Sequence, residues 1–371
     1  MTQPTLPATY PLPIATPEQA LATQQQLVAA LMRHFPDGGL FQADVGVVPD
    51  LGRPQSTARV ERALADAFGV PAAALVQGAG TGAIRAALGA GPWRSGSRRL
   101  LVHEAPDYPT TAALFADAGA DLVRADANNR DAWEDALADP DGPDWVFLQH
   151  TRQRLGDSYD LGTTIEAARR HGKRVIVDDN YAIIRTPHLG AQMGAAASAF
   201  SLFKLHGPEG VAAVVGDSDI VDAVQQANYS GGGQVQGHQA LDAIRALVMV
   251  PLNWAAQSAA SMQIVARLQA GELPGVADAA LANAQDLCVI VLLEEPIAER
   301  VRTAAATLGA APYPVGSNSR YEIAPLVYRL SSSSLDSNPE LAAWALRINP
   351  MRAGADVVID LLQRALNAAQ S

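Results

Sequence analysis

The sequence predicts an α/β protein with a large domain, built on a mostly parallel and doubly wound sheet, and a smaller α+β domain at the C-terminal end. From about residue 70 onward, short apolar runs bounded by turn residues alternate with stretches of helical periodicity. The runs lack the polar alternation of a strand that faces water, so helices are expected on both faces of the sheet. With 49% hydrophobic and 18% charged residues among 371, the chain has enough aliphatic surface for a large core.

Two helices precede the predicted sheet. Thr16 offers an N-cap hydroxyl, Pro17 occupies the first turn and Gln19 lies three residues after the cap, which predicts a helix from residue 17 to about residue 34. After a passage rich in Gly and Pro, the apolar spacing of residues 56–68 predicts a second helix that ends at Gly69.

The strands of the sheet follow, each bounded by turn residues. They are expected at residues 73–77, 100–103, 121–124, 145–149, 174–178, 197–201 and 211–215. Helical periods lie between them at residues 83–88, 110–118 and 163–171. This alternation is typical of βαβ units in a parallel sheet.

The C-terminal third begins with a long helical stretch at residues 236–270, which Pro251 interrupts. Shorter segments then mix strand and helix patterns, and the chain ends in a helix; these segments cover residues 289–293, 296–308, 323–328 and 354–368. The serine-rich segment 331–338 is expected to be a polar surface loop.

Three domains follow from this order of elements. Residues 1–50 are expected to form an N-terminal segment that packs with the small domain. Residues 51–255 are expected to form the large domain, and residues 256–371 the small C-terminal domain.

Charge and cysteine content exclude several classes of function. The 27 basic and 38 acidic residues leave a net charge of −11, which disfavours binding to nucleic acid or to an anionic membrane surface. The single cysteine, Cys288, cannot form an internal disulfide, and no Cys/His cluster has the spacing of a metal site. The first basic residue is Arg33, so we expect no signal peptide and a cytoplasmic location.

A glycine-rich turn, Gln77-Gly78-Ala79-Gly80-Thr81-Gly82-Ala83, lies where the first strand is expected to lead into a helix. Backbone N–H groups at such a helix N-terminus can bind a phosphate. The turn also fits a dinucleotide pattern, with Glu104 about 20 residues further on as the ribose ligand. A third interpretation is a tight turn that needs small residues.

Two further strand ends carry reactive groups. The apolar run 175–177 leads into Asp178 and Asp179, at the edge where open α/β sheets bind ligands. A carboxylate there can hold a cationic ring nitrogen, although acidic strand ends are often solvated turns or helix caps. Lys204 follows the apolar run 198–203 and is one of only two lysines, with Lys173. Desolvation favours the neutral amine that forms Schiff bases.

The order and spacing of these motifs, from about residue 40 to the end, resemble those of the fold-type I pyridoxal 5′-phosphate (PLP) enzymes, the aspartate aminotransferase superfamily. The resemblance implies that Gly80, Thr81 and Gly82 bind the cofactor phosphate. It also implies that an aromatic residue after the next strand stacks on the pyridine ring. In the segment His103-Glu104-Ala105-Pro106-Asp107-Tyr108-Pro109, the spacing favours Tyr108 over His103.

The same resemblance assigns roles to four residues near the reacting atoms. Asp178 would keep the pyridine nitrogen protonated, and Tyr181 would reach the phenolic oxygen. Ser201 would bond the phosphate, and Lys204 would form the Schiff base with the cofactor. These assignments make Lys204, Asp178 and Tyr181 the catalytic residues.

One segment departs from the family pattern. Many relatives carry Asn-Pro after the fourth strand, whereas this chain has Gln149-His150-Thr151-Arg152-Gln153-Arg154. Gln153 is the candidate that replaces the usual asparagine at the phenolic oxygen. No arginine at the phosphate is evident. The sequence of residues 149–154, together with the segments 230–234 and 347–354, is most similar to the YhfS-like group of aminotransferase class V-like proteins.

The resemblance implies a small-molecule amino acid substrate and a homodimer. Arg347 is the expected ligand of the substrate carboxylate, with Arg352 as the alternative. Tyr229 and the stretch 230–234 are candidates for a segment that crosses to a second subunit, or else form a flexible loop.

Transamination is the expected reaction, because most of the family are aminotransferases. A lyase that carries out β- or γ-elimination is the first alternative. A nicotinamide-dependent oxidoreductase is more remote, because it leaves the Asp178 and Lys204 segments without a role. A non-catalytic PLP-fold sensor is also disfavoured, because the N-terminal region is too short for a DNA-binding extension.

Overall fold

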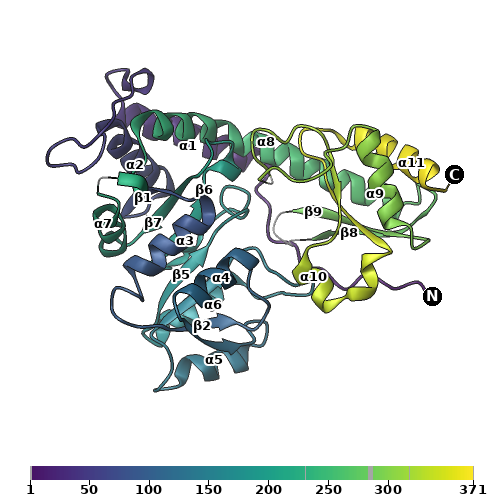
Figure 1. The fold of residues 1–371 in the computed structure, drawn as a ribbon, viewed down its shortest axis with the longest axis horizontal. Helices are drawn as coiled ribbons and strands as arrows, with labels where there is room; N and C mark the ends of the chain where they lie inside the picture. The colour runs from purple at the N-terminus through teal and green to yellow at the C-terminus, as the bar shows by residue number, and fades with distance from the viewer. Residues whose placement is uncertain (1, 230, 283–286, 317, 371) are drawn as a thin grey trace. The chain divides into compact units, whose positions relative to one another are not determined.

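The computed structural model describes residues 2–229, 231–282, 287–316 and 318–370 (Figure 1). The chain divides into two compact units. The larger comprises residues 15–150 and 159–252, and the smaller comprises residues 1–14, 151–158 and 253–371.

Residues 15–50 belong to the larger unit, which differs from the expectation that all of residues 1–50 pack with the small domain. The first helix, α1 (Pro17–His34), packs against α2 (Gln55–Phe68). An ion pair links them, with Arg33 Nε 2.8 Å from Asp66 Oδ2. Only residues 1–14 of the predicted N-terminal segment join the smaller unit.

The larger unit contains a seven-stranded sheet with the order β1-β7-β6-β5-β4-β2-β3. Strands β2 to β6 pair in parallel, and β7 is antiparallel to both of its neighbours. The strands span β1 Ala72–Gln77, β2 Arg99–His103, β3 Asp121–Ala125, β4 Trp145–Gln149, β5 Arg174–Asp178, β6 Ala197–Ser201 and β7 Val211–Gly216. The predicted mostly parallel, doubly wound sheet is therefore confirmed.

Helices cover both faces of this sheet (Figure 1). One face packs against α3 (Ala79–Ala90), α4 (Pro109–Asp117) and α7 (Ser218–Ala227). The other packs against α5 (Arg130–Ala138) and α6 (Leu161–Arg170). Successive residues of one strand, such as Ile176 and Val177, enter the cores on opposite faces of the sheet. This explains why the strands read as continuous apolar runs.

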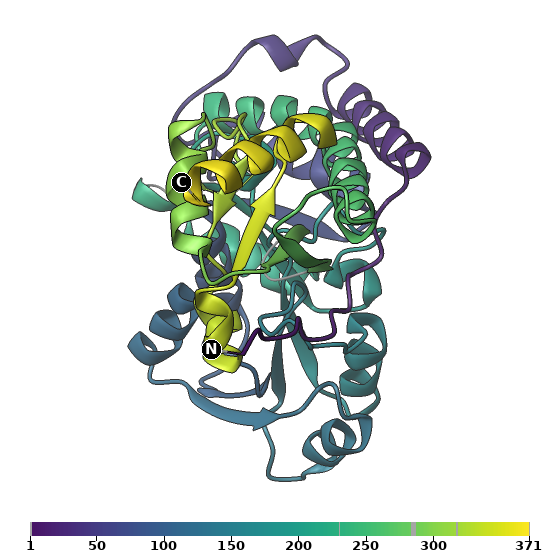
Figure 2. The same cartoon turned by 90° about the vertical axis from the view of Figure 1, so that its right-hand side faces the viewer.

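The smaller unit contains a four-stranded antiparallel sheet with the order β10-β11-β9-β8. Helices α9 and α11 pack against each other and share a core with this sheet (Figures 1 and 2). The elements span β8 Val276–Ala282, β9 Cys288–Leu293, α9 Ala298–Thr307, β10 Leu326–Tyr328, α10 Ser332–Ser337, β11 Ala345–Asn349 and α11 Ala355–Gln370. The long helix α8 (Gly237–Gln269), with Pro251 inside it, contributes residues to both units.

The prediction for residues 331–338 was wrong. Ser331 caps a short helix, α10, by accepting a hydrogen bond from the backbone N–H of Ser334. Ser333 and Ser334 are buried, so the segment is not a polar surface loop. Serine hydroxyls hydrogen-bond to one another there, with 2.7 Å between Oγ of Ser331 and Oγ of Ser334, and composition alone does not reveal such pairing.

None of the helices in the described part of the chain is both long and apolar enough to cross a membrane.

Candidate active site

The carboxyl ends of the parallel strands gather most of the predicted site residues at one edge of the larger sheet. The glycine turn follows β1, Tyr108 follows β2, Asp178 ends β5 and Lys204 follows β6. The antiparallel strand β7 begins at the same edge, where the carbonyl of Gly210 accepts a hydrogen bond from the N–H of Ala79 at 2.8 Å. Ligands of open α/β sheets bind at such an edge.

The glycine turn after β1 leaves no room for larger side chains. Gly78 has φ of 97°, in the left-handed region, and helix α3 begins at the next residue. A Cβ atom on Gly82 would lie 2.1 Å from the carbonyl oxygen of Gln77, and one on Gly80 would lie 2.4 Å from Oδ1 of Asn180. The small residues therefore bring the N-terminus of α3 close to the ends of β1 and β5.

A second hydroxyl lies beside Thr81. Oγ1 of Thr81 and Oγ1 of Thr110 are 2.8 Å apart, and Thr110 lies in the first turn of α4. Two helix N-termini therefore place a hydroxyl each at one position, which suits an anion. Thr110 was not among the predicted site residues, although Pro109 at the start of a helix was a usable indication of this N-terminus.

Lys204 lies between two aromatic rings. It is in a 3₁₀ turn, η3 (Phe203–Leu205), three residues beyond the end of β6. Its Nζ is 3.8 Å from the centroid of the Tyr181 ring and 6.0 Å from the centroid of the Tyr108 ring. Tyr181 has φ of 67°, and non-glycine residues in the left-handed region are concentrated at functional sites. The backbone N–H of Lys204 donates to Oγ of Ser201 at 3.4 Å.

Asp178 is 3% exposed, and its Oδ1 accepts hydrogen bonds from the backbone N–H and the side-chain amide of Asn180. Burial raises the pKa of the Asp178 carboxyl above its ordinary value, against the opposing effects of those hydrogen bonds and of the Lys204 charge. A cation beside this carboxylate would favour ionisation. The site is thus suited to a protonated ring nitrogen.

Asn180 connects the strand ends around this carboxylate. Besides its two bonds to Asp178, its Oδ1 accepts the N–H of Ser201 at 3.0 Å. It is also the side chain that a Cβ on Gly80 would meet. Asn180 was not among the predicted site residues, because only the fold brings these partners together.

Asp179 is neither a solvated turn residue nor a helix cap. Its side chain is fully buried, with Oδ1 2.6 Å from Nδ1 of His150 and Oδ2 accepting the N–H of Gly190 at 2.9 Å. Gly190 belongs to η2 (Gly190–Met193), which packs on the Val177 side chain. Asp178 and Asp179 therefore have separate sets of partners.

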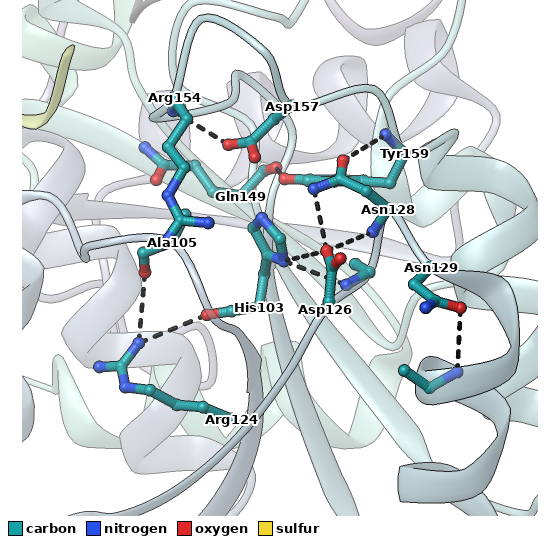
Figure 3. Close-up of polar contacts among 12 residues, drawn as sticks. His103, Ala105, Arg124, Asp126, Asn128, Asn129, Gln149, Arg154, Asp157 and Tyr159 are labelled. Atoms are coloured by element: carbon teal, nitrogen blue, oxygen red, sulfur yellow. Dashed lines mark hydrogen bonds and ion pairs between the residues drawn. The ribbon is translucent and has the colours of Figure 1, made fainter. Parts of the chain in front are cut away.

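His103, the alternative to Tyr108 after β2, has contacts of its own within the larger unit. Nδ1 of His103 accepts the backbone N–H of Ala127 at 3.1 Å, and its ring packs edge-on against Tyr159 (Figure 3). Asn128 joins this cluster by accepting the N–H of Tyr159 and donating to Asp126 (Figure 3). The imidazole of His103 is thus part of a packed polar cluster.

Gln153 and Arg347 belong to the smaller unit, whereas the other predicted site residues belong to the larger one. Oε1 of Gln153 accepts from Oγ of Ser333 at 3.0 Å. Its Nε2 is buried and has no hydrogen-bond partner among the residues that the structure describes. Arg347 lies on β11 opposite Tyr328, and its guanidinium carbon is 4.0 Å from the centroid of that ring.

Comparisons with known proteins identify the family. Residues 262–362 match the family model of the YhfS-like C-terminal domain, and residues 111–245 match that of aminotransferase class V. The YhfS protein of Escherichia coli K12 is 45% identical over 359 residues, which are 96% of this chain and 99% of that protein. The crystal structure of the pyridoxal-5′-phosphate-dependent protein YhfS from Escherichia coli has a TM-score of 0.94 and 44% identity, and the match covers 97% of this chain and 99% of that chain.

More distant structures share the fold. Cystathionine γ-synthase from Xanthomonas oryzae pv. oryzae has a TM-score of 0.70 with 16% identity, covering 94% of this chain and 98% of that chain. The methionine γ-lyase CalE6 from Micromonospora echinospora has a TM-score of 0.66 with 21% identity, covering 85% and 87%. The predicted fold class is confirmed, and the resemblance to a nicotinamide-binding turn does not reflect the family. The chain belongs to the YhfS-like family, within the fold-type I class of pyridoxal-5′-phosphate-dependent enzymes.

Proposed function

We propose that this protein is an aminotransferase that acts on an amino acid through Lys204, with pyridoxal 5′-phosphate as its cofactor. One observation carries the PLP-dependent part of the proposal: Nζ of Lys204 lies 3.8 Å from the centroid of the Tyr181 ring, and its charge interacts with the buried carboxyl of Asp178. An amine, a phenol and a carboxyl are the groups that PLP chemistry requires of the protein.

The residues in the larger unit fit the cofactor. The turn of Gly80, Thr81 and Gly82 leaves no room for larger side chains near the N-terminus of α3, and the hydroxyls of Thr81 and Thr110 lie together there. These groups and Ser201 would hold the phosphate. Tyr108 would stack on the pyridine ring, and Asp178 would face its nitrogen.

Gln153 would complete the ring contacts. The partnerless Nε2 of Gln153 is a buried donor whose orientation Ser333 fixes through Oε1. A buried donor without an acceptor costs about 1–3 kcal/mol, which a phenolic oxygen would offset. The family resemblance assigns this amide to the phenolic oxygen of PLP, and the proposal keeps that assignment.

Bound PLP supplies an electron sink that weakens the bonds to the α-carbon of an amino acid. The Lys204 amine would hold the cofactor at its aldehyde group and would move the α-proton of the substrate. The Asp178 carboxylate would stabilise a positive charge on the ring nitrogen. The Arg347 guanidinium holds the substrate carboxylate through two parallel hydrogen bonds.

The test is a panel of amino acids incubated with the purified holoenzyme, with and without an added 2-oxo acid. An aminotransferase forms more than one equivalent of a new 2-oxo acid per active site only when the acceptor is present. A lyase, the alternative that begins with the same α-proton transfer, releases ammonia without the acceptor. Acceptor-independent ammonia release would therefore replace transamination by elimination while leaving the roles of Lys204 and Asp178 in place.

We also propose that the protein is a homodimer. Large apolar side chains are exposed in the larger unit: Phe41 is 84%, Val45 70% and Tyr229 62% exposed. A Cβ on Gly52 would lie 3.2 Å from the Tyr229 ring, so the loop before α2 and Tyr229 form one surface. Ser230, part of the predicted crossing segment, lies outside the described residues. Light scattering of the active protein at the monomer mass would contradict this proposal.

A further inference from the structure

Arg124, on β3, donates hydrogen bonds to three oxygen atoms of the segment that leads to Tyr108. Its Nη1 atom donates to the carbonyl oxygens of His103 and Ala105, at 3.3 Å each (Figure 3). The other terminal nitrogen, Nη2, lies 2.5 Å from Oδ2 of Asp107. A single guanidinium thus contacts the backbone before Pro106 and the side chain after it.

The conformation of this short segment determines where the Tyr108 ring lies. Tyr108 is the N-cap of α4, with extended backbone angles of −58° and 136°, and α4 begins at Pro109. Pro106 and Pro109 have fixed φ angles, and a proline also restricts the residue before it. Few torsions remain free between the end of β2 and the tyrosine, and Arg124 contacts the residues that carry them.

Contacts of this kind contribute little to global stability. The Arg124 side chain is 37% exposed and that of Asp107 14% exposed. An ion pair with one exposed partner is typically worth well under about 1 kcal/mol. The backbone of β2 is already aligned with β3, since His103 pairs with Ala125 and the N–H of Glu104 donates to the carbonyl of Ala125. Two of the three Arg124 contacts, those to Ala105 and Asp107, lie beyond that ladder, on the segment 105–107.

We propose that Arg124 is a positioning residue that holds the segment 105–107 so that the Tyr108 ring stacks on the cofactor. The inference rests on the proposed function, because Tyr108 is its assigned stacking residue. An arginine is needed because a planar guanidinium can reach two carbonyls and a carboxylate at once, whereas a lysine offers a single point charge.

The experiment measures the apparent dissociation constant of PLP for the apoprotein by absorbance titration. Losing one aromatic stacking contact should weaken binding about fivefold to tenfold. We expect Tyr108→Ala to do so, and Arg124→Met to show most of the same loss. Asp107→Asn, which removes one contact and keeps the arginine, should show a smaller loss in the same direction.

A double-mutant cycle separates positioning from a general structural role. If Arg124 acts through Tyr108, Arg124→Met should add no further loss in the Tyr108→Ala background. Equal losses in both backgrounds would overturn the proposal. So would an Arg124→Met apoprotein with wild-type PLP affinity.

Arg99→Met is the matched control. Arg99 lies at the opposite end of β2, where its Nε is 3.1 Å from Asp121 Oδ2 and its Nη1 donates to the carbonyl of Asp141 at 2.5 Å. This substitution should leave PLP affinity within twofold of wild type, and a loss equal to that of Arg124→Met would count against a specific role. If Tyr108→Ala has no effect although the wild type binds PLP through Lys204, the positioning inference fails and the proposed function stands.

Discussion

His150 and Asp179 form a buried pair, with Nδ1 of the imidazole 2.6 Å from Oδ1 of the carboxylate and side-chain exposures of 3% and 0%. The pair lies just beyond the ends of β4 and β5, because each residue follows the last residue of its strand. It gives Asp179 a structural role that is separate from the contacts of Asp178 with Asn180 and Lys204. Adjacent carboxylates at one strand end therefore have different partners.

The first prediction concerns these two carboxylates. Asp178→Asn should keep the fold but lower the turnover rate on the order of 10²-fold or more, because the amide cannot stabilise a protonated ring nitrogen. Asp179→Asn should reduce the rate much less. It should instead lower the free energy of unfolding by about 1–3 kcal/mol, because a buried charged hydrogen bond is lost.

Turnover rates and denaturant unfolding of both variants check this prediction. A larger rate loss in Asp179→Asn than in Asp178→Asn would assign the ring nitrogen to Asp179, one residue further along the strand end. Because alternate residues face opposite sides of a strand, that result would also reverse which face of β5 holds the cofactor.

The second prediction concerns Lys204. The purified protein should be yellow, with an absorption band near the roughly 420 nm typical of a lysine-bound PLP, because Lys204 is the lysine placed at the strand ends. Lys204→Ala should lose both that band and turnover. Lys173→Ala is the control, since Lys173 lies between α6 and β5, away from the carboxyl ends of the strands. A borohydride-reducible band that persists in Lys204→Ala and disappears in Lys173→Ala would contradict the assignment.

The strands were the most predictable part of this fold. Residues 145–149, 174–178 and 197–201 are strands with the predicted bounds, because these runs are buried on both faces and end in turn residues. The first helix also has its predicted bounds, since its capping box is local. Family resemblance and strand-end position together supplied Lys204, Asp178 and Tyr181 as candidates.

The sequence pattern could not predict hydrogen-bond partners that come from distant segments of the chain. Thr110 and Thr81 are far apart in the chain, and only the packing of α4 beside α3 brings their hydroxyls together. His150 lies in the segment 149–154, in which Gln153 was the predicted site residue. The hydrogen-bond partner of His150 is Asp179, which the sequence pattern did not indicate. The serines of α10 were expected at the surface, because a polar composition does not show that the hydroxyls bond one another in a buried position.

The third prediction concerns Glu61, which is 2% exposed on α2. Its Oε2 lies 2.5 Å from Nε of Arg53, and its Oε1 accepts the N–H of Leu75 at 2.9 Å. Burial raises the pKa of the Glu61 carboxyl to about 7, although the charge of Arg53 opposes the rise. The folded state therefore binds this proton more tightly than the unfolded state, whose value is 4.5.

The sign of the pH dependence follows from linkage. Between about pH 4.5 and pH 7, the folded state holds more protons at this site, so the free energy of unfolding falls as the pH rises. The fall amounts to as much as about 3 kcal/mol for this group. Glu61→Gln should remove that part of the pH dependence, and Glu299→Gln, at an exposed carboxylate, should not. Identical unfolding curves against pH for Glu61→Gln and wild type would contradict the prediction.

The last prediction concerns the substrate carboxylate. Arg347 is 6% exposed on β11, and its guanidinium lies 4.0 Å from the centroid of the Tyr328 ring. Such a stack holds the guanidinium plane in a fixed orientation, as bidentate recognition of a carboxylate requires. Arg352 is placed differently: burial lowers the pKa of its guanidinium, and the charge of Glu322 opposes that shift, so an internal acid already faces it.

Arg347→Lys should therefore raise the apparent Michaelis constant for the amino acid by one to two orders of magnitude, or roughly 1.4 to 2.7 kcal/mol. The absorption band of the lysine-bound cofactor should stay unchanged, because the substitution removes substrate contacts only. Arg352→Lys should have a much smaller effect on the Michaelis constant, since Glu322 can pair with either cation. If Arg352→Lys alone causes the large increase, the carboxylate ligand is Arg352, and the stacking of Arg347 on Tyr328 is a structural contact of β10 and β11.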